Sequence, residues 1–285
     1  MVARGHSHAD TLFGPTIADG IHLWFHDLTG RIISRFSDLA EEGPLFQMMI
    51  EDRQMARRDW VKESTFGQWF LSTDTWVNRV LKIALDDLES LMTQRSDRYS
   101  TILEVGFGHG HSLPMLDQRF SPEKIIGLDI DPKAVELSAD KIKACVSDVQ
   151  IIVGDAASID LPDASVDMVF CHQTLHHTTD QPGAVSEFFR VLKPGGTLLL
   201  AESCRKFIHS LPVKILFRHP MDVQKTDIEY LQLLEDSGFV TRPENISRPY
   251  LWWSRTDLGL LEKLGKKLPK DREETLVNVV AYRPE

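Results

Sequence analysis

The stretch TILEVGFGHG, residues 101–110, decides the fold class of this 285-residue chain. Its first half is a short, mostly apolar run rich in β-branched residues, which predicts a buried strand over 101–105. Its second half has glycine at every other position, at Gly106, Gly108 and Gly110. Glycine permits a tight turn and lets the backbone approach a ligand closely. The stretch therefore predicts a strand that ends at a ligand-binding turn.

Further short apolar runs follow this stretch and alternate with helical patterns. They are KIIGLDI at 124–130, VQIIVGD at 149–155, VDMVFC at 166–171 and TLLLAE at 197–202. Strands joined by helical crossovers of this length form a parallel sheet with helices on both faces. The sequence thus predicts a doubly wound α/β core.

Two carboxylates stand at the ends of these predicted strands. Asp129 ends the second strand, close to the offset of about 20 residues expected for a carboxylate that accepts hydrogen bonds from ribose hydroxyls. Asp155 ends the third strand and could receive an adenine amino group. In such sheets, ligands bind outside the carboxyl ends of the strands. Under the alternative interpretation, the glycines only make a turn and the aspartates only cap helices.

A nicotinamide-dependent oxidoreductase shares this fold and is the next alternative. Its fingerprint, G-x-G-x-x-G/A, requires a small residue at position 111 so that helix and strand pack closely. Here position 111 is His111, and the glycines run G-x-G-x-G. This departure disfavours a dinucleotide with a pyrophosphate.

The motifs ILEVGFGHG, GLDIDP, VGDA, VDMVFCHQTLHH and VLKPGGTLLLAE resemble the successive motifs of class I S-adenosylmethionine-dependent methyltransferases that act on small molecules. The resemblance covers about residues 99–203, the predicted cofactor-binding core. It implies a Rossmann-like, mostly parallel seven-stranded sheet whose last strand, at 276–282, runs antiparallel. Residues 1–98 would form an N-terminal helical and aromatic lid. Residues 204–285 would supply a basic insert after strand five, substrate-side elements and the final strands.

The resemblance also implies a role for each matched residue. Glu104 and the glycine loop would hold the methionine end of S-adenosylmethionine, and S-adenosylhomocysteine would be the product. Cys171 and His172 would lie beside the sulfonium. The implied cofactor residues are Glu104, Gly106, Gly108, Gly110, Asp129, Ile130, Asp155, Ala156 and Cys171.

Histidines supply the candidate catalytic residues. Methyl transfer from a sulfonium is an in-line displacement that needs alignment, exclusion of water and, for some acceptors, removal of a proton. Histidine suits that last task because it titrates near neutrality. His172 is the first candidate, followed by His176 and its neighbour His177. The alternative interpretation is that the His176–His177 pair packs or forms hydrogen bonds locally.

Aromatic and basic residues in the flanking regions predict the acceptor pocket. Trp69, in the predicted lid, would form one wall of this pocket, although an aromatic stripe is also typical of a core. Arg218 or His219 would hold a carboxylate or phosphate, although the basic stretch 204–225 is also typical of a solvated helix. Trp252 would add a flat wall. Together these residues favour a small acidic or aromatic acceptor, and a cofactor-binding regulator without turnover is the alternative.

Composition limits the partners and the setting. The net charge of −10 disfavours a nucleic acid or a polyanionic membrane as a partner. Three cysteines without a CxxC pair disfavour a zinc ribbon or a disulfide framework. The absence of a long apolar run or a signal peptide predicts a cytoplasmic protein. His22 and His26 have metal-ligand spacing but no clear third ligand, so no metal site is predicted, and the sequence does not indicate an oligomeric state.

Overall fold

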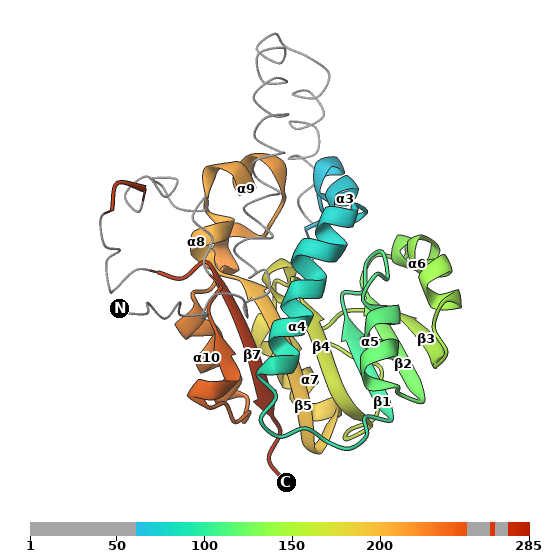
Figure 1. Cartoon of the computed structure of the whole chain (residues 1–285). Helices are drawn as coiled ribbons and strands as arrows, with labels where there is room; N and C mark the ends of the chain where they lie inside the picture. The colour runs from blue at the N-terminus through green and yellow to red at the C-terminus, as the bar shows by residue number, and fades with distance from the viewer. Residues whose placement is uncertain (1–60, 250–262, 266–272) are drawn as a thin grey trace, which may run out of the picture.

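The computed structural model describes residues 61–249, 263–265 and 273–285, and its centre is a seven-stranded sheet (Figure 1). The strand order is β3-β2-β1-β4-β5-β7-β6. The strands are β1 (Thr101–Val105), β2 (Lys124–Asp129), β3 (Asp148–Val153), β4 (Val166–His172), β5 (Leu192–Ser203), β6 (Ile246–Ser247) and β7 (Leu276–Tyr282). Strands β1 to β5 pair in parallel, whereas β7 runs antiparallel to β5 and β6. The predicted Rossmann-like fold is confirmed.

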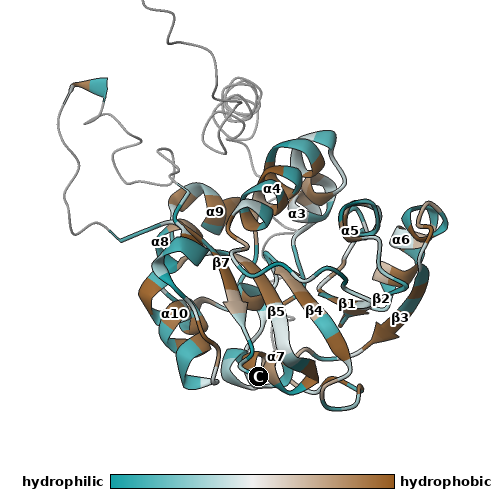
Figure 2. Cartoon of the chain, turned by 60° about the horizontal axis from the view of Figure 1, so that its bottom comes forward, coloured by the Kyte–Doolittle hydropathy of each residue, from teal (hydrophilic) through white to brown (hydrophobic). Residues whose placement is uncertain are grey.

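The central strands are apolar because the sheet is covered on both faces. In β4, five consecutive residues from Met168 to His172 are buried. Strands with two covered faces are typically continuous apolar runs rather than alternating ones. Figure 2 shows long hydrophobic stretches in β4 and β7.

Helices form a layer on each face of this sheet. One core contains residues of α4 (Lys82–Ser90), α5 (Leu113–Phe120) and α6 (Lys133–Lys143). The other contains residues of α7 (Gln181–Val191) and α10 (Asp227–Asp236). In Figure 1, α4 and α5 lie in front of the sheet. No helix within the described residues is long and apolar enough to cross a membrane.

Segments that precede β1 and follow β5 lie above the carboxyl edge of the sheet (Figure 1). They are α3 (Thr65–Leu71), a π-helix (Trp76–Leu81), α8 (Arg205–Ile208) and α9 (Leu211–Leu216). The hydroxyl of Ser64 caps α3 and donates to the carbonyl of Leu216 at 2.5 Å. The Phe217 ring meets Phe66 and Phe70 edge-on, with centroids 5.5 and 5.8 Å apart. The N-terminal segment and the insert after β5 therefore form one cover over the sheet.

Candidate active site

A cavity of about 280 Å³ lies between this cover and the carboxyl ends of the strands. We divide its wall by the order of the strands in the sheet. The glycine side follows β1, β2 and β3 and includes Gly106, Gly108, Asp129 and Asp155. The histidine side follows β4 and β5 and lies under α3 and α9. Its polar residues are Glu63, Gln68, Gln173, Thr174, His176, His177, Thr178, Thr179, Ser203 and His219. Both sides open into the same cavity.

Two glycines shape the turn after β1. Gly106 has a φ of +75°, and a Cβ there would overlap the side chain of Thr174. Gly108 has a φ of +49°, and a Cβ there would meet no atom within 4 Å. A positive φ favours glycine, and the open space at Gly108 lets a ligand approach the bare backbone. The turn therefore has the shape of a ligand cradle.

Asp129 is tied to this turn by its own hydrogen bonds. Its carboxylate accepts from the backbone N–H of Gly108 at 2.8 Å and from that of Asp131 at 2.9 Å. Burial raises the pKa of Asp129, and the backbone donors oppose that rise. The carboxylate is thus oriented before a ligand arrives. Ile130 and Ala156 line the same side of the cavity.

Asp155 lies two residues beyond the end of β3, because this strand ends at Val153. Its carboxylate accepts from the backbone N–H of Ala157 at 2.9 Å. The side chain borders the cavity and is exposed. In this position the Asp155 carboxylate can contact the end of a ligand that lies nearest the solvent.

Glu104 and Gly110 do not line the cavity, although both are predicted to hold the cofactor. Glu104 is buried beneath the turn, where it accepts from the hydroxyl of Ser112. Burial raises the pKa of Glu104 to about 8, and its Oε2 has no hydrogen-bond partner among the described residues. Gly110 faces Ser138 of α6. Both residues support the turn from behind, and the unpaired Oε2 fits a donor supplied by a ligand.

Cys171 and His172 are not brought to the cavity, in contrast to the prediction. Strand β4 continues through His172, one residue further than expected. Both residues therefore belong to the strand, where neighbouring side chains point to opposite faces of the sheet. The Cys171 thiol lies 3.7 Å from Glu202, and burial raises its pKa well above the usual value. The His172 ring packs 5.4 Å from Trp76, and burial lowers its pKa to about 4. His172 is therefore a poor candidate for a base.

The residues directly after β4 take the expected place. Gln173 and Thr174 line the cavity. Gln173 has a φ of +52°, and its side-chain carbonyl accepts from the hydroxyl of Ser203. A non-glycine residue in the left-handed region is uncommon and often marks a functional site. Sequence reasoning missed both residues, and the end of the apolar run was the available signal.

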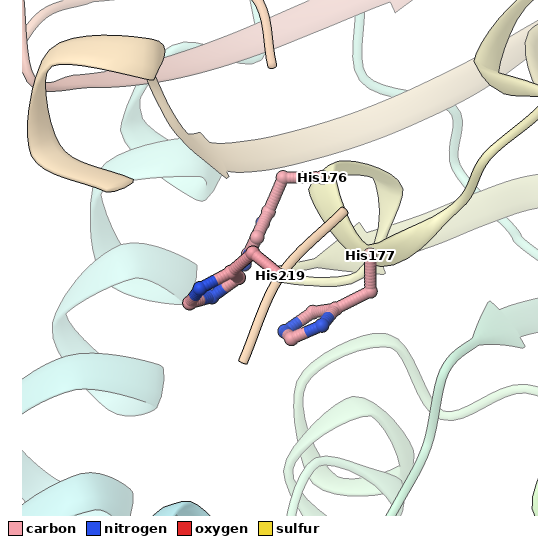
Figure 3. A group of neighbouring side chains, drawn as sticks. All are labelled: His176, His177 and His219. Atoms are coloured by element: carbon pink, nitrogen blue, oxygen red, sulfur yellow. The ribbon is translucent and has the colours of Figure 1, made fainter. Parts of the chain in front are cut away.

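Three imidazoles gather on the histidine side. His176 and His177 belong to a 3₁₀ turn, Leu175–His177, and His219 follows α9. Figure 3 shows their rings extending to the same side of that turn. The ring centroids lie 4.4 to 5.1 Å apart, and one nitrogen of each ring lies within 4.8 Å of the others. The fold thus brings together residues that are 43 positions apart.

A buried carboxylate from β5 fixes this turn. Glu202 accepts from the backbone N–H groups of Thr174 and Leu175 at 3.0 and 2.8 Å. Its second oxygen lies 2.6 Å from Nδ1 of His176. Gln224 adds a bond from its amide to the carbonyl of His176 at 2.7 Å. His176 is therefore held in one orientation, with Nε2 as its remaining ring nitrogen.

A second carboxylate approaches the histidines from the N-terminal segment. Oε1 of Glu63 accepts from the backbone N–H groups of Ser64 and Arg218 at 2.6 and 3.0 Å. Its Oε2 lies 3.9 Å from Nε2 of His177. Burial raises the pKa of Glu63, and it lowers those of His177 and His219, the latter to about 2. Both of these rings are neutral near pH 7 and keep a nitrogen lone pair.

The predicted substrate residues meet different outcomes. His219 lines the cavity, whereas Arg218 does not and contributes its backbone N–H to Glu63. Trp69 is 55% exposed and outside the wall, and Trp252 lies outside the described residues. Among the described residues, the aromatic wall is instead made by Phe70, Trp76, Phe207 and Phe217.

No lysine or arginine contributes to the cavity wall within the described part of the chain. In the basic stretch, Arg205 lies 3.3 Å from Glu229 and 3.4 Å from Glu273. The local positive charge is thus partly neutralised by acidic neighbours. The cavity has an aromatic and imidazole wall with little positive charge.

Comparison with known proteins agrees with this architecture. Residues 103–200 match the family model described as "Methyltransferase domain". A protein of Mycolicibacterium smegmatis named "Probable S-adenosylmethionine-dependent methyltransferase" is 35% identical over 139 residues, 48% of this chain and 51% of that protein. Phosphoethanolamine N-methyltransferase 1 of Arabidopsis thaliana is 25% identical over 217 residues, 73% of this chain and 41% of that protein. The chain thus spans about half or less of the length of these curated relatives.

Solved structures share the fold. An S-adenosylmethionine-dependent methyltransferase from Aquifex aeolicus superposes with a TM-score of 0.52 at 20% identity, over 76% of this chain and 96% of that one. Another from Mesorhizobium loti has a TM-score of 0.53 at 16% identity, over 73% of this chain and all of that one. The cradle of glycines and the strand-end aspartates lie within residues 103–200 or directly support them, and this part of the chain matches the methyltransferase-domain family and is similar to S-adenosylmethionine-dependent methyltransferases.

Proposed function

We propose that this chain transfers the methyl group of S-adenosylmethionine to an oxygen, nitrogen or carbon atom of a small molecule. One observation carries the proposal: a single cavity joins the glycine side to the histidine side. The glycine side has groups that can bind a nucleoside, and the histidine side has groups that can hold an acceptor. Such an arrangement places two reactants in one enclosed space.

The glycine side would hold the cofactor through this chain's own residues. The bare backbone at Gly108 gives room for the methionine end, and the unpaired Oε2 of Glu104 lies behind it. The carboxylate of Asp129 would accept from the ribose hydroxyls, and Asp155 would meet the adenine. When bound, the cofactor supplies an electrophilic methyl group whose bond to sulfur breaks, with the electron pair left on sulfur, as the acceptor's lone pair attacks in line.

The histidine side would hold the acceptor. Phe70, Trp76 and Phe217 offer an aromatic wall that excludes water. His176 replaces His172 as the candidate for an acceptor-orienting group, because it lines the cavity and is fixed by Glu202. Imidazole nitrogens can accept a proton from a hydroxyl, thiol or ammonium group.

The wall also narrows the class of acceptor. The phosphoethanolamine enzyme named above acts on a small molecule, which supports a small acceptor here. However, the described part of the wall has no lysine or arginine, and Glu63 borders it. We therefore favour an aromatic or apolar acceptor with one reactive heteroatom over an acceptor with a free carboxylate or phosphate.

Calorimetric titration with S-adenosylmethionine, S-adenosylhomocysteine and NAD tests the cofactor side first. We expect micromolar binding of both adenosyl compounds and none of NAD. A screen of phenols, thiols and aromatic amines, read out as S-adenosylhomocysteine formed, then tests turnover. Preference for NAD would refute the proposal. Tight adenosyl binding without turnover on any class would instead favour a regulator that only binds the cofactor.

A further inference from the structure

We propose that His176, His177 and His219 form a binding site for a divalent transition-metal ion on the acceptor side of the cavity, with Glu63 as a fourth ligand. The site itself follows from these side chains alone. Its role in holding the acceptor rests on the proposed function. The sequence predicted no metal site, because two of the four ligands come from segments that show no relation to the His176–His177 pair until the chain folds.

The donor set is the first argument. Three imidazoles whose ligand atoms lie within 4.8 Å of one another converge on one point of the cavity wall. Zinc has ligand bonds of about 2.1 Å, which in a tetrahedron places neighbouring nitrogens about 3.4 Å apart. Small side-chain rotations would close that difference. The carboxylate oxygen of Glu63, 3.9 Å from Nε2 of His177, lies at the same place.

The surroundings of His176 are the second argument. Ligating histidines usually pair their other ring nitrogen with a carboxylate, which fixes the tautomer and the orientation of the ring. Here Nδ1 of His176 lies 2.6 Å from the fully buried Glu202. This leaves Nε2 for a ligand.

The ligand types select the metal. Imidazole-rich sites suit zinc and its neighbours in the first transition row, whereas magnesium and calcium prefer oxygen ligands. Three histidine ligands are typical of a catalytic rather than a structural zinc site, and Glu63 would be the ligand that the acceptor displaces. In that position the metal would take an ionised hydroxyl or thiol of the acceptor, whose proton passes to bulk water. The metal thus supplies the positive charge that the described wall lacks.

Titration of the metal-free, untagged full-length protein tests the site. Zinc binding is followed by calorimetry, and cobalt(II) binding by its visible d–d absorption bands. We expect one equivalent to bind, and His219→Ala to weaken that binding at least about 100-fold. His209→Ala is the matched control, because it removes an exposed histidine ten positions away and should bind like wild type. Glu202→Gln should weaken binding about 10-fold to 100-fold through the orientation of His176.

The outcomes separate this site from the proposed function. Equal zinc binding in wild type, His209→Ala and His219→Ala would overturn the metal site, as would no binding to wild type. His177→Gln repeats the test with a smaller change, should His219→Ala fail to fold. The affinity of the metal-free protein for S-adenosylmethionine is measured in parallel. If metal-free wild type does not bind S-adenosylmethionine, the methyltransferase proposal is refuted and the metal result still stands.

Discussion

The two sides of the cavity are built in different ways. The glycine side is made by turns at the ends of consecutive strands, and its key contacts are local, such as the bond from Gly108 to Asp129. The histidine side is assembled from segments far apart in the sequence, and Glu63 contacts Arg218 across 155 positions. The two sides thus differ in how far apart in the sequence their contacting residues lie. Function specific to this chain is therefore to be sought on the histidine side.

Gly108→Val should give the largest effect, confined to the glycine side. The positive φ and the intruding side chain would block the cradle, so we expect cofactor affinity to fall more than about 100-fold, or about 2.7 kcal/mol. Calorimetry measures the affinity, and circular dichroism checks the fold. Val80→Ala, which removes bulk from the cavity wall, is the control. Unchanged affinity in Gly108→Val would place the cofactor elsewhere.

Asp129→Ala should have the next largest effect. It removes the predicted ribose partner and frees two backbone N–H groups, so cofactor affinity should fall by on the order of 2 kcal/mol. Asp155→Ala changes a residue at the exposed edge of the cavity, so this variant should lose less cofactor affinity than Asp129→Ala. Equal losses in the two variants would contradict the distinction drawn between a buried and an exposed carboxylate.

Phe217→Ala should affect the histidine side and leave the glycine side intact. The ring joins α9 to Phe66 and Phe70 of α3, so its removal should loosen the cover. Because aromatic pairs of this kind contribute about 1 kcal/mol each, we expect the acceptor KM to rise several-fold. Cofactor affinity should change little. A matching loss of cofactor affinity would mean that the two sides do not act separately.

His172→Phe should have the smallest effect on turnover, which we expect to stay within about threefold of wild type because the ring lies outside the cavity. Its effect on stability should depend on pH. The folded-state pKa of about 4 lies below the unfolded value of 6.5, so wild type loses stability as pH falls from about 6.5 to 4.

The variant lacks this ionisation, so between pH 7.5 and pH 5 it should lose less free energy of unfolding than wild type, by about 2 kcal/mol. Urea unfolding at pH 5 and pH 7.5 measures the difference, and His209→Phe serves as the exposed control. A large loss of turnover in His172→Phe would restore His172 as the catalytic base.

The parallel strands of the core and most of the glycine side could be predicted, because both depend on local patterns. Apolar runs, glycines and the carboxylate after a strand are visible within about 30 residues of sequence. The errors at Cys171 and His172 came from one residue of uncertainty at the end of β4, which moved the predicted cavity residues off Gln173 and Thr174. Strand ends are the least certain part of such predictions.

The histidine side could be predicted only in fragments. His176 and His219 were each identified as candidates, but nothing in the sequence indicates that α9 returns His219 to the turn after β4. Trp69 and Trp76 both belong to an aromatic segment, yet of the two only Trp76 lines the cavity. Such long-range packing has no signal in a single sequence.

The burial of Glu202 sets an order of assembly. Its carboxylate accepts from the backbone of the turn after β4, yet it belongs to β5, which follows a whole helix later in the chain. During synthesis the strands of the glycine side can pair before β5 has emerged, whereas the turn that holds His176 lacks its acceptor until β5 docks. We therefore expect the turn that holds His176 to take its final form only after β5 has docked.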